Sequence, residues 1–323
     1  MFSLQEYRAR PRQLADFLPW AALIAPGVVL NKDGGFQRTA RFRGPDLDSA
    51  TNAELSGVAG RLNNALRRLG SGWAIFVEAQ RHASAAYPDS LFPDPVSGLV
   101  EEERRAAFQA DRSHFESAYY LTLVWLPPAE DRGRAARWLY EGEAEKGVDW
   151  PSQVRGFINR TDRLLALIEG LMPQAAWLDD EATLTFLHAT VSTARQCVRL
   201  PETPMHLDVL LADRALVGGL APRLGGAHLR VLTVIGFPTA TWPGLLDELN
   251  RLAFDYRWTT RALCLDKTDA GRLLGRIRRQ WFAKRKSIGA LLKEVMTNEA
   301  AVLMDSDADN KAADADQALQ DLG

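Results

Sequence analysis

Residues 22–43, ALIAPGVVLNKDGGFQRTARFR, contain two runs of β-forming residues on either side of a turn. We predict one strand over 22–30 and a second over 36–43, because β-branched and aromatic residues favour strands. Between them, residues 31–35 supply asparagine, aspartate and two glycines. Glycine allows the positive φ angle that a tight turn requires. The stretch therefore predicts a β-hairpin.

The residues that follow the hairpin predict a helix and then another strand. Thr51 and Glu54 have the spacing of a capping box, in which each side chain satisfies a backbone N–H group at a helix start. Apolar residues recur at helical spacing beyond it, and Gly70 can end the helix. Residues 73–79, WAIFVEA, have the composition of a buried strand. Together these elements predict a compact α+β unit.

The rest of the chain continues to alternate between helices and strands. Further helices are predicted over 100–116, 153–172 and 181–193, and a further strand over 119–126. A proline- and glycine-rich stretch over 200–226 marks a boundary or a long connection. A strand–helix–strand unit is predicted after it, over 229–237, 243–252 and 258–265. The predicted fold class is α+β, with mixed sheets, packed helices and strand–helix–strand units, ending in a long basic helix.

The predicted organisation has four sections. They are an amino-terminal α+β domain (1–200), a second strand–helix–strand unit (201–270), a long basic amphipathic helix (271–304) and an acidic linker (305–323). The change at residue 305 is abrupt. Residues 271–304 carry eight basic residues against two acidic ones, whereas residues 305–323 carry six aspartates against one lysine.

The acidic linker also begins like a calcium-binding loop. Asn310 stands where that loop needs a glycine for its sharp turn, and Asp316 is shorter than the bidentate glutamate expected at the last position. We therefore interpret the segment as a solvated acidic linker and predict no metal site there.

The basic helix is the clearest candidate for contact with another molecule. Its cations can meet phosphates, anionic lipid headgroups or an acidic partner protein. The residues of interest are Arg272, Arg276, Arg278, Arg279, Trp281, Phe282, Lys284, Arg285 and Lys286. The alternative is a helix docked on the protein core, whose arginine and lysine stems cover apolar surface.

A second candidate surface lies near the amino terminus. Trp20, Leu23 and Ile24 lie close to two prolines, in an apolar run that spans residues 17–30. They can form an exposed apolar edge for a partner, or they can pack in the core as part of the first strand. The run is too short for a membrane span, which needs about 20 apolar residues.

Composition indicates a soluble globular protein, with 46% hydrophobic and 25% charged residues. The 39 basic and 41 acidic residues nearly balance, so there is no overall attraction to nucleic acid or anionic lipid. We expect a cytoplasmic protein, unless something holds it at a membrane.

No constellation of residues predicts catalysis. A phosphate-binding loop needs the pattern G-x-x-x-x-G-K-[ST], and Lys267-Thr268 supplies its last pair without the preceding glycines. The five histidines are scattered, and none has the i, i+4 partner of a zinc-binding helix. His188 falls on an apolar stripe and is predicted to be a satisfied, half-buried histidine. We therefore predict no catalytic residue, no cofactor and no ATP hydrolysis by this chain.

Six long stretches resemble the TrbE branch of the CagE/TrbE/VirB family of conjugal-transfer, type IV secretion ATPases. They are residues 27–51, 70–90, 156–173, 177–193, 235–254 and 278–300. The resemblance implies a cytoplasmic ATPase that forms oligomers at the base of a secretion channel. It implies that the amino-terminal region docks on inner-membrane components, while ATP and magnesium bind in a later RecA-like domain. The segment 305–323 would then lead toward an ATPase domain absent from this sequence.

The preferred hypothesis is a non-catalytic docking module, peripheral at the bacterial inner membrane. It would attach the motor to type IV secretion inner-membrane components and to neighbouring subunits. Trp20, Leu23 and Ile24 would face the membrane-side partner, and the helix 276–286 would face the motor domain, a neighbouring subunit or lipid. The alternative is a module that binds single-stranded nucleic acid through residues 272–286. An independent enzyme is a third hypothesis.

Overall fold

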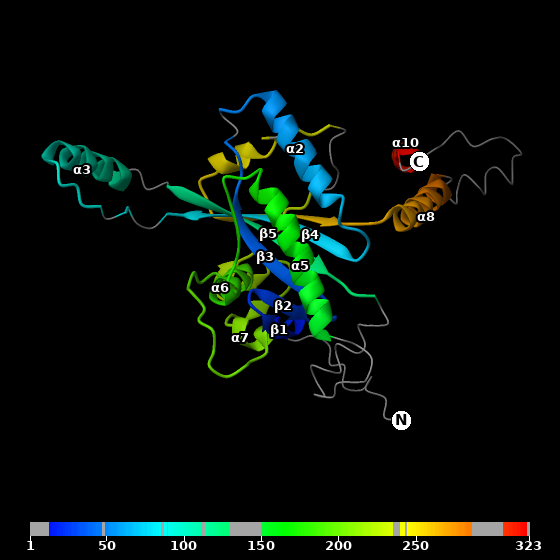
Figure 1. The fold of residues 1–323 in the computed structure, drawn as a ribbon, viewed down its shortest axis with the longest axis horizontal. Coiled ribbons are helices and arrows are strands. Elements are labelled where there is room, and N and C mark those ends of the chain that lie inside the picture. The colour runs from blue at the N-terminus through cyan, green and yellow to red at the C-terminus, as the bar shows by residue number, and fades with distance from the viewer. Residues whose placement is uncertain are drawn as a thin grey trace, which may run out of the picture. The chain divides into compact units, whose positions relative to one another are not determined.

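The computed structural model of the protein describes most of the chain. The described residues are 13–46, 49–84, 87–88, 90–110, 114–128, 150–234, 240–242, 244–285 and 306–321. The chain divides into two compact units. The first comprises Met1–Arg68 and Ala74–Ala262, and the second comprises Leu69–Trp73 and Leu263–Gly323. The elements are shown in Figure 1.

A seven-stranded sheet forms the first unit, in the spatial order β1-β2-β3-β5-β4-β10, with β6 also paired to β3. Its strands are β1 (Trp20–Ala25), β2 (Val28–Asn31), β3 (Phe36–Arg43), β4 (Trp73–Ala83), β5 (Phe115–Trp125), β6 (Gln174–Trp177) and β10 (Tyr256–Leu263). The β1–β2, β2–β3, β3–β5 and β3–β6 pairs are antiparallel. One edge of β3 is shared, because β2 pairs with residues 36–38 and β6 with residues 40–43.

Two helices connect the central strands. The first unit contains α1 (Leu14–Phe17), α2 (Asn52–Leu66), α3 (Pro95–Ala110), α5 (Trp150–Glu169), α6 (Asp180–Val191), α7 (Leu207–Leu211) and the 3₁₀ helix η2 (Asp247–Arg251). Strand β3 leads through α2 to β4, and β5 leads through α5 to β6. The spatial order β6-β3-β5-β4 is therefore that of a ferredoxin-like βαββαβ core. A small sheet of β7 (Leu216–Val217), β8 (Arg223–Leu224) and β9 (Ala227–His228) completes the unit.

One face of the sheet packs against α5, which lies across β3 in Figure 1. Phe36 of β3 is fully buried there. Its ring centroid lies 5.7 Å from that of Trp125, 4.9 Å from that of Trp150 and 5.5 Å from that of Phe157. The apolar stripe along α5 thus meets the alternate residues of β3 that point to this face.

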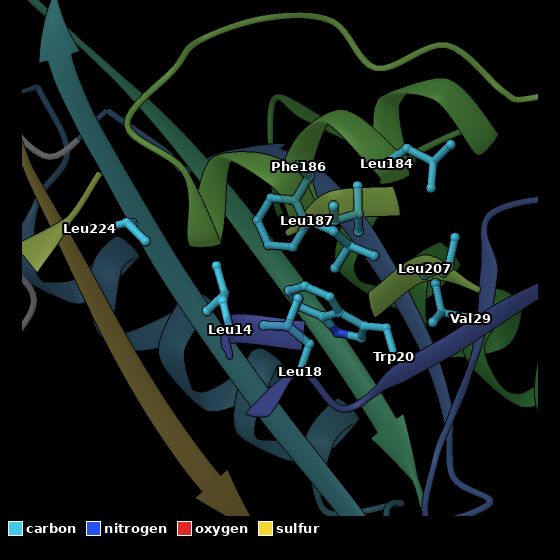
Figure 2. Packing of buried hydrophobic residues seen from close by; sticks show 10 residues of the cluster. Leu14, Leu18, Trp20, Val29, Leu184, Phe186, Leu187, Leu207 and Leu224 are labelled. Carbon is cyan, nitrogen blue, oxygen red and sulfur yellow. The ribbon is translucent and has the colours of Figure 1, made fainter. Parts of the chain in front are cut away.

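The opposite face is covered by α6 and α7. Because neighbouring residues of a strand point to opposite faces, Val29 of β2 faces away from α5 and joins this second cluster. The cluster contains Leu14, Leu18, Trp20, Val29, Leu184, Phe186, Leu187, Leu207, Leu211 and Leu224. Figure 2 shows Trp20 among these side chains. The protein is therefore an α+β fold with apolar packing on both faces of its sheet.

The second unit contains two helices, α8 (Lys267–Arg285) and α10 (Ser306–Asp321). Asp266 precedes α8, and its carboxylate accepts a hydrogen bond of 2.9 Å from the Asp269 backbone N–H. The Ser71 hydroxyl donates to Asp269 at 2.5 Å and accepts from the Asp266 N–H at 3.0 Å. These contacts fix the start of α8 to residues 69–73, and α10 packs along α8.

Several predicted elements are confirmed. The hairpin over β2 and β3 turns at Gly34, whose φ angle is 83°. Helix α2 begins with the predicted capping box, in which the Thr51 hydroxyl accepts from the Glu54 N–H. The predicted helix over 181–193 corresponds to α6.

Other predictions were wrong. Residues 22–30 do not form one strand, because Pro26 and Gly27 turn the chain between β1 and β2. Residues 229–234 are not a strand, and 235–237 lie outside the described residues. The acidic segment is not an extended linker, since most of it forms α10. The long basic helix is described only as far as Arg285, and residues 286–304 also lie outside the described residues.

Candidate docking surfaces

His188 is the most deeply buried of the histidines, and its surroundings are structural. Its Nε2 lies 3.0 Å from a carboxylate oxygen of Asp213, and the Ser192 hydroxyl donates to the same oxygen at 3.3 Å. Serine and histidine therefore both contact the aspartate, and the histidine is not placed to take a proton from the serine. Burial alone would raise the pKa of Asp213, but the hydrogen bonds from His188 and Ser192, with the charges of His188 and Arg214, hold it below its ordinary value.

The described residues also hold no group of three or more histidine, cysteine, aspartate or glutamate side chains arranged to bind a metal ion. None of the described helices is both long enough and apolar enough to cross a membrane. The candidate functional sites are therefore surfaces of the molecule.

The amino-terminal apolar residues divide between core and surface. Trp20 is 7% exposed and belongs to the cluster under α6 and α7, which favours core packing over an exposed edge. Leu23 is partly buried against the same cluster, and Ile24 is also partly buried. Strand β1 lies at the edge of the sheet, so its outer backbone remains a candidate for contact with a partner.

Helix α8 presents three arginines on one side. Arg272, Arg276 and Arg279 follow the spacing i, i+4, i+7, so they lie within about 60° of one another around the helix axis. All three side chains are exposed. Arg272 pairs with Asp269 at 3.1 Å, whereas Arg276 and Arg279 have no ion-pair partner among the described residues. We name Arg272, Arg276 and Arg279 the basic stripe.

Arg278 lies outside the basic stripe, about 120° around the axis from its centre. Its Nη1 donates to Asp316 of α10 at 3.0 Å. The structure thus separates the predicted basic residues into an exposed group and one that contacts α10. The side chains of Trp281, Phe282, Lys284 and Arg285, and the whole of Lys286, lie outside the described residues.

A groove of about 1540 Å³ was not predicted from the sequence. It is lined by the ends of β3, β5, β6 and α5, including Arg41, Arg43, Tyr119, Glu169 and Gln174. Its floor depends on β6, whose sequence QAAW carries little strand signal. The alternation of arginine and apolar residues in β3 was a usable signal, because it places Arg41 and Arg43 on the same side of that strand.

Helix α3 is a further surface that the sequence did not indicate. Among its residues none is buried, and Val96 and Leu99 are 69% and 60% exposed. These two side chains share a face of the helix with Val100, which is 44% exposed. Three acidic residues, 101–103, follow directly.

Comparison with known proteins defines the class to which this architecture belongs. Residues 27–133, from β2 to just beyond β5, match the family model of the type IV secretion system ATPase VirB4/TrbE, N-terminal domain. The chain is 33% identical over 343 residues to the conjugal transfer protein TrbE of Rhizobium radiobacter, covering 100% of this chain and 42% of that protein.

Two further relatives agree. The type IV secretion system protein virB4 of Bartonella henselae is 22% identical over 282 residues, which are 82% of this chain and 35% of that protein. The type IV secretion system protein virB4 of Brucella suis is 26% identical over 117 residues, covering 36% of this chain and 14% of that protein. The chain belongs to the VirB4/TrbE family of type IV secretion proteins and corresponds to its amino-terminal region. It spans less than half the length of the Rhizobium radiobacter relative.

Proposed function

We propose that the chain is a non-catalytic docking module of a conjugal-transfer ATPase. In this proposal it attaches the motor to the inner-membrane components of a type IV secretion system and to neighbouring subunits, as a peripheral protein of the inner membrane. ATP and magnesium would bind to another region of the longer protein and not to these residues.

The observation that carries the proposal is the basic stripe on α8. Exposed arginines at i, i+4 and i+7 give a row of charge along one side of a helix, and guanidinium groups pair with carboxylates in two-pronged hydrogen bonds. Arg276 and Arg279 make no ion pair with any described residue, so a partner can engage them without first breaking a salt bridge. The stripe therefore suits an acidic protein surface.

The role of the other candidate residues follows from their exposure. Leu23 and Ile24 remain candidates for the membrane-side contact through the β1 edge. Trp20 is a poor choice for a binding test, because its replacement would disturb the core in which it is buried.

Co-purification tests the proposal. The tagged chain would be incubated with detergent-solubilised inner membranes from cells that express the inner-membrane proteins of the same transfer system. We expect these proteins to be retained, and retention to fall about tenfold or more in Arg276→Glu/Arg279→Glu. The charge-matched control Arg230→Glu/Arg261→Glu changes two exposed arginines of the first unit and should bind normally. Equal retention by all three proteins would contradict a docking role for the stripe.

A second candidate function is binding of single-stranded nucleic acid by the same stripe. Three phosphate contacts would make the logarithm of affinity fall with the logarithm of salt concentration with a slope of about −2. Titration of a labelled oligothymidine at several salt concentrations measures that slope. Binding that has this slope and disappears in Arg276→Glu/Arg279→Glu would favour nucleic acid, and no binding at low salt would eliminate it.

A further inference from the structure

We propose that the Arg278 side of α8 is a binding site for an acidic helix, and that α10 occupies it as an exchangeable intramolecular ligand. An acidic helix of a partner protein would displace α10 and take its place. This inference rests on the proposed docking function and adds to it the kind of partner and the means of regulation.

The contacts between the two helices are few and mostly exposed. The Arg278–Asp316 pair spans 3.0 Å, and each of the two side chains is 52% exposed. Among the α10 side chains that the structure describes, residues 313–320, Ala315 is buried, at 5% exposure. A small residue at this position lets the two helix backbones approach closely. The contact therefore combines one exposed ion pair with a narrow apolar seam.

Such a contact is specific but weakly held. An ion pair between exposed side chains stabilises a structure little and is screened by salt. A helix of 16 residues is also marginal in water without a partner to pack against. Release of α10 from α8 should therefore unwind it, and this makes the release measurable.

The composition of the segment identifies the class of ligand. Residues 305–323 contain six aspartates and one lysine, and Asp314 and Asp316 are both exposed on α10. An acidic amphipathic helix presenting a small apolar residue beside a carboxylate would reproduce what α10 offers to Arg278. The basic stripe lies elsewhere around α8, so a partner can hold the stripe while its acidic helix replaces α10.

Hydrogen exchange of the α10 amides tests whether the helix is held by charge. We expect exchange to accelerate about fivefold or more between about 0.1 M and 1 M salt, as the Debye length falls from about 10 Å to about 3 Å. Asp316→Lys and Arg278→Glu should accelerate it similarly at low salt. The charge swap Arg278→Asp/Asp316→Arg should restore protection, and Arg276→Glu on the basic stripe should leave it unchanged. Protection that ignores salt and both single substitutions would overturn the proposal.

Exchange with a ligand in trans is the second measurement. The probe is a fluorescein-labelled peptide of residues 306–321, SDADNKAADADQALQD. We expect it to bind the Asp316→Lys chain about fivefold or more tightly than the unchanged chain, and to lose binding in Arg278→Glu. The same peptide with Asp314→Asn and Asp316→Asn should bind weakly. Equal binding to all chains, or none to any, would overturn the site. These readouts need no secretion protein, so failure of the docking function would not be confused with failure of this inference.

Discussion

Arg257 of β10 holds Glu78 of β4 in a two-pronged ion pair. The arginine Nε and Nη2 donate to the same carboxylate oxygen at 3.1 and 2.6 Å. Glu78 is also an acceptor for Gln80 at 2.5 Å and for Thr259 at 3.3 Å. The remaining arginine nitrogen donates to the carbonyl oxygen of Thr190 near the end of α6, at 2.7 Å. One side chain thus joins β10, β4 and α6.

Arg257→Met should destabilise the protein by about 2–3 kcal/mol. The substitution leaves the Glu78 carboxylate, whose side chain is 9% exposed, without its cation, and removal of one member of a buried pair is costly. The effect is reduced because the arginine itself is 33% exposed. Urea denaturation measures the loss. Arg261→Met, at an exposed position of the same strand, should change stability by no more than about 0.5 kcal/mol. Equal effects of the two substitutions would contradict this account of the pair.

Gly27→Ala should cost about 2 kcal/mol or more in the free energy of unfolding. Gly27 has a φ angle of 66°, and an added Cβ would overlap the carbonyl oxygen of Leu178. Its N–H also donates to Asp180 at 2.7 Å, which joins the β1–β2 turn to the start of α6.

Gly57→Ala is the matched control for the glycine substitution. Gly57 lies inside α2, and no atom comes within 4 Å of an added Cβ. The replacement should stabilise the protein by about 0.5–1 kcal/mol, because alanine favours the helix and restricts the unfolded chain. Thermal unfolding of both variants gives the two signs, and a stabilising Gly27→Ala would show that the turn is not constrained as described.

Stability should decline as the pH falls below about 6.5, with a contribution from His82. Burial, followed by the charge of Arg195, lowers the pKa of this histidine, although Glu116 and Asp255 oppose the shift. A histidine with a lowered pKa in the folded state contributes fully above its unfolded pKa. The contribution is lost as the pH falls toward the folded pKa.

The measurement is the free energy of unfolding at about pH 7.5 and pH 5.5, on either side of the unfolded pKa. His82→Gln should lose less stability between the two values than the unchanged protein does. Equal losses in the two proteins would show that His82 does not contribute to the pH dependence.

Purified chain should release no phosphate from ATP above a buffer blank, with or without magnesium. The sequence offers no glycine loop before Lys267-Thr268, so it lacks the backbone N–H groups that would hold a triphosphate. Turnover that persists through further purification would contradict the proposal that the module is non-catalytic.

Local chemistry made the strongest elements predictable. The turn chemistry of residues 31–35 and the capping box at Thr51 both act within a few residues, and both are confirmed. The split of residues 22–30 by Pro26 and Gly27 was also available from turn signals, but the continuous apolar run suggested one strand. The pairing of β6 with β3 was not predictable in this way, because it joins segments more than 130 residues apart.

The surfaces were harder to predict because exposure depends on tertiary packing. The sequence left two interpretations open for Trp20, and burial beneath α6 decided between them. It grouped Arg276, Arg278 and Arg279 as one basic face, whereas contact with α10 sets Arg278 apart. The acidic segment looked like a solvated linker because its side chains are polar, but pairing with α8 gives it a helical partner.

Binding to native inner-membrane vesicles tests the docking claim most directly. Vesicles would be prepared from cells with and without the inner-membrane proteins of the matching transfer system, and the bound fraction of the purified chain measured by flotation. The account predicts saturable binding only to vesicles that contain those proteins, reduced about tenfold or more by Arg276→Glu/Arg279→Glu. Equal flotation with both kinds of vesicle, or none with either, would contradict it.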